Sequence, residues 1–178
     1  MTLVFIVGVS GTGKHRLLLR LQEHGWNCAD LRRFPASDSD SFSASVMAGD
    51  YEKLDEDLSR GIALLAADAR SRPGEHFAVA VPELVFELPK LGYSKAFSRF
   101  RICAEECGVL PVCLQSDLSC LVRKNGLFGA KSQFIMPRRV LREKIGQLNR
   151  IWDTFSVLRI DTSAGVEEAV KQVILHSF

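Results

Sequence analysis

The feature that most constrains the fold is a glycine-rich turn directly after an apolar run near the N-terminus. Residues 3–8 are Leu-Val-Phe-Ile-Val-Gly, a continuous apolar segment typical of a central parallel strand covered on both faces. Residues 8–15 are Gly-Val-Ser-Gly-Thr-Gly-Lys-His, and Leu17, Leu18 and Leu21 follow at helical spacing. This order of strand, glycine-rich turn and amphipathic helix predicts the first unit of an α/β sheet.

The turn fits the phosphate-loop pattern through its lysine. Glycines let several backbone N–H groups point at one anion, and the following helix directs its positive end at the same place. The lysine adds a point charge for the β- and γ-phosphates. The turn therefore predicts a site for a nucleoside triphosphate, the alternative being a glycine-rich turn without a ligand. The binding residues that we expect are Gly8, Ser10, Gly11, Thr12, Gly13, Lys14 and His15.

One position departs from the pattern. The residue after the lysine is His15, where the pattern has a Ser or Thr whose hydroxyl ligates magnesium. Imidazole is a poor ligand for this hard cation. Glu83, which follows the apolar segment 76–81, is the candidate for holding Mg²⁺, and an exposed loop glutamate is the alternative. The departure bears on turnover more than on nucleotide binding.

The rest of the chain alternates apolar segments with amphipathic helices. The alternation predicts an open, five-stranded parallel sheet with helices on both faces, a three-layer α/β/α domain over residues 1–178. We expect further strands at 26–30, 76–81, 109–114 and 155–160. We expect helices at 53–72, 94–107, 117–124 and 137–152, a loop or short helix at 35–50, and a closing helix capped by residues 161–163.

Composition narrows the function classes. The formal net charge of the 178 residues is only +2, which gives no support for a nucleic-acid partner. No run approaches the ~18 consecutive apolar residues of a membrane helix. The five cysteines are odd in number and lie mostly in apolar segments, as expected for reduced thiols of a cytoplasmic protein.

With the loop in place, the whole chain resembles the small P-loop kinases: shikimate kinase, gluconate kinase and adenylate-kinase-like enzymes. The order of elements is similar over nearly the full length, and Gly-Val-Ser-Gly-Thr-Gly-Lys looks most like the gluconate kinase loop. The resemblance implies the P-loop NTPase fold. It also implies a magnesium-dependent transfer of the γ-phosphoryl group of ATP to a hydroxyl of a small molecule or nucleotide.

The resemblance also implies roles for individual residues. Asp30, at the end of the second strand, corresponds to an acidic residue that contacts the acceptor and acts as base. Arg123 corresponds to an arginine that stacks on adenine, and the segment Asp161, Thr162 and Ser163 to the adenine edge. Residues 47–57 are similar to the acceptor segment of gluconate kinase, with an acidic helix start as the alternative reading.

A small basic lid is implied at about residues 123–144. Its basic residues are Arg123, Lys124, Lys131, Arg138, Arg139, Arg142 and Lys144, against one acid, Glu143. Arginines suit phosphate oxygens, and we expect Arg138 and Arg139 to take part in catalysis. Gly126 and Gly129 would let the lid close. The alternative for this cluster is a solvated basic helix face.

Three functions remain open. The first is the kinase, with Arg32 and Arg33 available to hold an anionic acceptor or lying as an ordinary surface pair. The second is a catalytically weak nucleotide-binding module that acts through a partner, which His15 favours. The third is a kinase acting on a hydroxyl of nucleic acid. No residue pattern identifies the acceptor or distinguishes ATP from GTP.

Overall fold

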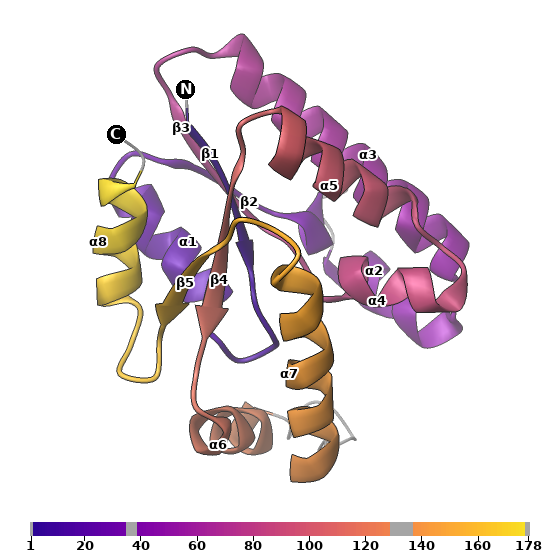
Figure 1. Cartoon of the computed structure of the whole chain (residues 1–178). Helices are drawn as coiled ribbons and strands as arrows, with labels where there is room; N and C mark the ends of the chain where they lie inside the picture. The colour runs from indigo at the N-terminus through magenta and orange to yellow at the C-terminus, as the bar shows by residue number, and fades with distance from the viewer. Residues whose placement is uncertain (1, 35–38, 129–136, 177–178) are drawn as a thin grey trace.

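The computed structural model describes residues 2–34, 39–128 and 137–176, in which strands and helices alternate (Figure 1). The strands are β1 (Thr2–Val7), β2 (Asn27–Asp30), β3 (His76–Ala80), β4 (Leu110–Gln115) and β5 (Leu158–Asp161). The helices are α1 (Lys14–Glu23), α2 (Ser39–Ala48), α3 (Tyr51–Ser71), α4 (Leu84–Glu87), α5 (Lys95–Glu106), α6 (Leu118–Phe128), α7 (Arg138–Trp152) and α8 (Glu167–Leu175). Two 3₁₀ turns, η1 (Leu31–Arg33) and η2 (Leu88–Leu91), follow β2 and α4.

The sheet has five strands in the order β2-β3-β1-β4-β5, and all four pairings are parallel. The apolar first strand is therefore the central one, as predicted. Because all strands run the same way, their carboxyl ends meet at one edge of the sheet, where Figure 1 places α6. The glycine-rich turn between β1 and α1 lies at this edge, which is where open α/β sheets bind ligands.

Two hydrophobic layers cover the faces of the sheet. Alternate residues of β1 supply both: Phe5 packs with Phe86 and Phe100 on the face of α3, α5 and α7, while Val4 and Ile6 pack on the face of α1 and α8. A strand covered on both faces needs no polar side chain, which is why β1 is a continuous apolar run. The predicted three-layer α/β/α fold is confirmed.

The chain departs from the prediction at the closing helix. Residues 161–163 do not cap it: Asp161 instead accepts hydrogen bonds from the backbone N (2.9 Å) and the Oγ (2.6 Å) of Ser163. Gly165 then takes a φ of +137°, and α8 begins only at Glu167 without a side-chain cap. The predicted cap is wrong because the carboxylate closes a local turn, a known competitor of helix capping.

The last strand also starts later than predicted. We expected it from residue 155, but the amides of Thr154 and Phe155 donate to the carbonyls of Ile151 and Trp152 at the end of α7. An amide bonded to a helix end cannot join the sheet ladder, so β5 begins at Leu158.

Candidate functional site

The glycine-rich turn has the backbone that its sequence demands. Gly8, Gly11 and Gly13 have φ values of +147°, +91° and +95°, a region that other residues rarely adopt. A Cβ on Gly8 would lie 2.7 Å from the carbonyl oxygen of Leu114 and equally close to Thr12 Oγ1. The buried Thr12 hydroxyl donates to the Val9 carbonyl at 2.9 Å, which closes the turn from within.

Lys14 begins α1 and turns its ammonium group back over the loop. Its Nζ donates to the carbonyl oxygens of Gly8 and Val9, the latter at 3.1 Å. Burial lowers the pKa of Lys14 to about 8, against which the nearby carboxylate of Glu83 acts. A buried ammonium with only neutral carbonyl partners gains most from an arriving anion, because the anion restores part of the lost solvation.

One backbone amide of the loop is already bound by the carboxylate of Glu83, which follows β3. The backbone N of Ser10 donates to Glu83 Oε2 at 3.0 Å. The other oxygen of Glu83 accepts from Lys144 Nζ of α7 at 2.7 Å, and Lys144 also lies 3.0 Å from Glu87 Oε1. Burial lowers the pKa of Lys144, but the two carboxylates outweigh burial and raise it, so Lys144 is a fixed positive charge.

Asp30 lies where β2 ends and is held by its neighbour. The Arg32 guanidinium binds it in a fork, with Nε 3.0 Å from Oδ1 and Nη2 2.5 Å from Oδ2, and the Arg32 amide donates to Oδ1 at 3.0 Å. Burial raises the pKa of Asp30, but the hydrogen bonds and the charge of Arg32 together lower it by more. The pKa of Asp30 therefore lies below its ordinary value. Asp30 is therefore ionised at neutral pH.

These groups meet in one pocket of about 310 Å³. Its lining joins the loop, the end of β2, the residues after β3, and α2 and α7. The lining residues are Ser10, Lys14, Asp30, Arg32, Phe42, Val46, Ala80, Val81, Pro82, Glu83, Leu84, Glu87 and Lys144. Of the predicted residues, the structure thus brings Ser10, Lys14, Asp30 and Glu83 together.

The oxygen and nitrogen donors at this pocket are mostly engaged by other protein groups. His15 is exposed, and both oxygens of Glu83 already accept hydrogen bonds from protein N–H groups. Asp30 is bound by Arg32, and within residues 2–34, 39–128 and 137–176 no three His, Cys, Asp or Glu side chains gather to hold a metal. The donor set as it stands does not fit Mg²⁺, which needs free oxygen ligands.

The residues expected near adenine lie on the other side of the loop. Thr162 is buried: its Oγ1 donates to the Thr12 carbonyl at 2.7 Å and also lies 2.9 Å from the Gln115 carbonyl oxygen. The Ser163 hydroxyl accepts from the amide of Asp117, next to α6. Arg123 is exposed on α6. The structure therefore gives Thr162 a structural task and brings Ser163 near the helix that carries Arg123.

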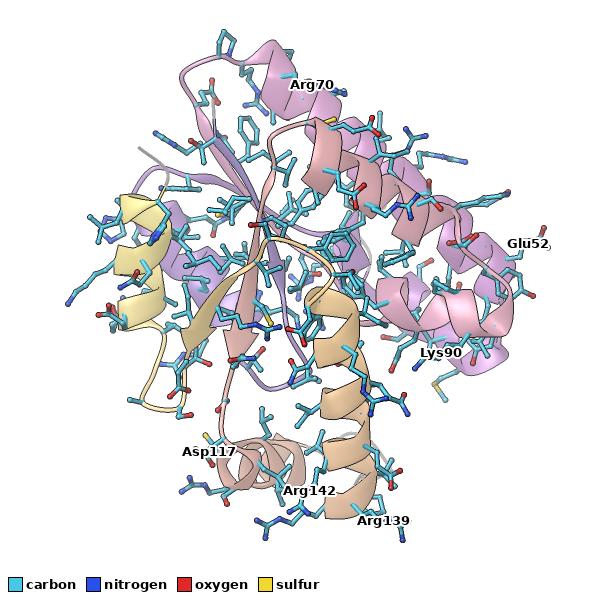
Figure 2. The ribbon with its side chains drawn as sticks, in the orientation of Figure 1. Glu52, Arg70, Lys90, Asp117, Arg139 and Arg142 are labelled. Atoms are coloured by element: carbon cyan, nitrogen blue, oxygen red, sulfur yellow. The ribbon has the colours of Figure 1, made fainter. Side chains whose placement is uncertain are left out.

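Two of the expected lid residues, Arg138 and Arg139, do not line the pocket. Arg138 and Arg139 are exposed at the start of α7, where Arg139 pairs with Glu143 at 3.0 Å. Figure 2 shows Arg139 and Arg142 in the first turns of α7, where Arg142 lies beside α6. Lys131 and Gly129 lie outside the described residues.

Sequence reasoning counted Lys144 as a lid residue and missed its place in the pocket. A signal was present, because Lys144 follows the buried Leu141 by three residues and precedes the buried Leu148 by four, which is the inner face of a helix. Glu87 was missed because α4 was not predicted.

Asp55, in the segment similar to gluconate kinase, is buried and accepts hydrogen bonds from the amides of Lys95 and Ala96 at the start of α5.

Comparison with known proteins identifies the fold. No family model and no curated protein matches the chain. Shikimate kinase from Acinetobacter baumannii, solved in complex with shikimate, superposes with a TM-score of 0.65 at 15% identity over 99% of this chain and 92% of its own. Gluconokinase from Sinorhizobium meliloti gives 0.53 at 16% over 99% and 98%, and deoxyadenosine kinase from M. mycoides with bound dATP gives 0.57 at 10% over 98% of each. The chain thus has the fold of the small P-loop kinases, as the sequence predicted.

No helix in the described part of the chain is long and apolar enough to cross a bilayer.

Proposed function

We propose that the chain is an ATP-dependent kinase that phosphorylates a hydroxyl group of a small molecule or nucleotide. The observation that supports this most is the pocket of about 310 Å³, which is lined both by the loop residues Ser10 and Lys14 and by Asp30. A molecule in the pocket would touch the end of a phosphate chain bound in the loop. Acceptor and donor would then be aligned, which is the main requirement of phosphoryl transfer.

Each charged group has a task in this reaction. Lys14 moves from the loop carbonyls to the transferring phosphoryl group and offsets its charge. Asp30 accepts a hydrogen bond from the acceptor hydroxyl. Because Arg32 lowers its pKa, Asp30 is a weak base, and it orients the hydroxyl more than it deprotonates it. The loose transition state of phosphoryl transfer needs little base strength, so this role suffices.

A transfer assay tests the proposal. The protein is incubated with γ-labelled ATP, magnesium chloride and a panel of sugars, nucleosides, polyols and metabolites. We expect label on one acceptor, and a loss of about 100-fold or more in Lys14→Ala and in Asp30→Asn. Asp68→Asn, at an exposed carboxylate that pairs with Arg72, is the matched control and should keep full activity. Transfer that persists in Lys14→Ala would contradict the proposal.

A second candidate is a nucleotide-binding module that works through a partner and turns over slowly. His15 in place of the magnesium-ligating hydroxyl and the Glu83 carboxylate on the Ser10 amide favour it. ATP binding by calorimetry with no labelled product from any acceptor would support this function over the kinase.

A further inference from the structure

Apart from Lys14, the charged side chains of the pocket are already paired with one another. Both oxygens of Asp30 are bound by the Arg32 fork, at 3.0 Å from Nε and 2.5 Å from Nη2. Lys144 lies between two carboxylates, 2.7 Å from Glu83 and 3.0 Å from Glu87. The Lys144 side chain is only 20% exposed, so these contacts are sheltered from water and from screening.

Lys14 belongs to the loop and faces the nucleotide. Without it, the described lining of the pocket has two cations, Arg32 and Lys144, for the three carboxylates of Asp30, Glu83 and Glu87. An anionic acceptor would have to break one of these pairs and then lie beside an unpaired carboxylate. Like charges at close range are strongly disfavoured, so the pocket discriminates against anions.

The remaining wall of the pocket is apolar. Phe42 and Val46 of α2 face it, together with Val81, Pro82 and Leu84 after β3. Such a wall suits the face of a ring or a short hydrocarbon part, while carboxylate oxygens suit hydroxyl donors.

We infer that the acceptor is an uncharged molecule, with hydroxyl groups on one side and an apolar face on the other, and carries neither carboxylate nor phosphate. This inference rests on the proposed kinase function and names the acceptor class for the same site. It also assigns Glu87 as a specificity-determining residue, because Glu87 holds Lys144 away from an incoming anion.

Pairs of related probes, one neutral and one anionic, test the inference. We would use deoxyadenosine with dAMP, gluconamide with gluconate, and methyl shikimate with shikimate. Dissociation constants are measured by titration calorimetry or ligand-observed NMR with the loop saturated by a non-hydrolysable ATP analogue. We expect the neutral member of any pair that binds to bind at least about tenfold more tightly. An anionic member that binds equally well or better overturns the inference.

A variant then tests the origin of the selectivity. Glu87→Gln leaves Lys144 partly unpaired, so the preference for the neutral member should shrink by about threefold or more. Glu105→Gln, at an exposed carboxylate 3.9 Å from Arg101 on α5, is the matched control and should keep the full preference. An unchanged preference in Glu87→Gln overturns the assignment of that residue.

The two proposals fail in different ways. Efficient phosphorylation of an anionic acceptor contradicts the inference and leaves the kinase function standing. Absence of any affinity for the ATP analogue contradicts the kinase function itself.

Discussion

At the scale of single residues, Lys14 carries the most sensitive charge of the site. Its ammonium is buried over the loop, and burial holds its pKa at about 8. Lysine is charged below its pKa, and an anionic nucleotide prefers the charged form. Nucleotide affinity should therefore depend on pH in the range just above neutrality, which is unusual for a lysine.

We expect ATP affinity to fall by about tenfold or more between pH 7.5 and 9.5, because the loop loses a charge-assisted contact. Titration calorimetry at several pH values, in buffers of matched ionic strength, measures it. Lys14→Arg is the control, since a guanidinium stays charged over the whole range and its profile should be flat. An equally steep profile in Lys14→Arg would show that another group titrates.

Glu83 has an effect of the opposite sign. Its carboxylate accepts a hydrogen bond from the Ser10 amide, and a phosphate oxygen that binds this amide would have to displace it. Glu83→Gln removes this negative charge, so ATP affinity should rise by about threefold or more. Glu75→Gln, at an exposed carboxylate, is the control and should not change the affinity. A weaker affinity in Glu83→Gln would instead indicate that the carboxylate helps to bind the nucleotide.

At the scale of elements, α5 is held by a carboxylate of another helix. Its own N-cap residue makes no side-chain hydrogen bond, and the buried Asp55 of α3 accepts the amides of Lys95 at 2.9 Å and Ala96 at 2.8 Å. An acidic group at a helix N-terminus also matches the helix dipole. Asp55 is therefore a structural residue that couples the two helices.

Asp55→Ala should lower the free energy of unfolding by about 2–3 kcal/mol, because it leaves two amides unsatisfied in the interior. Asp55→Asn keeps one oxygen and should cost less, while Asp57→Ala, at a half-buried carboxylate of the same helix, is the comparison. Urea denaturation followed by circular dichroism measures the differences. A loss below about 0.5 kcal/mol in Asp55→Ala would show that water satisfies the amides.

At the scale of the whole molecule, local pattern predicted the sheet, the loop and the place of Asp30. Each of these is encoded by neighbours in sequence: an apolar run, glycines that need positive φ, a carboxylate where a strand ends. What the sequence did not show is which side chains meet across the fold. Glu83 and Lys144 are 61 positions apart, and no periodic pattern in the sequence predicts that they pair.

The same reason explains the error at the closing helix. Residues 161–163 were expected to cap a helix, but Thr162 is bonded to Thr12 and Gln115, which only the packed sheet brings near. The similarity of the segment around Asp55 to an acceptor site stays a prediction, although Asp55 itself binds the first amides of α5. Polar residues with several possible partners are assigned by tertiary packing, and local sequence leaves the choice open.

The bond between the Thr162 hydroxyl and the Thr12 carbonyl joins residues 150 positions apart. During synthesis the glycine-rich turn is made early, but Thr162, which supports the turn through this bond, follows β5 and is made much later. On the proposed function, a nucleotide would therefore bind only after residues near Thr162 have folded against the turn, and a shorter piece of the chain would carry the motif without the site.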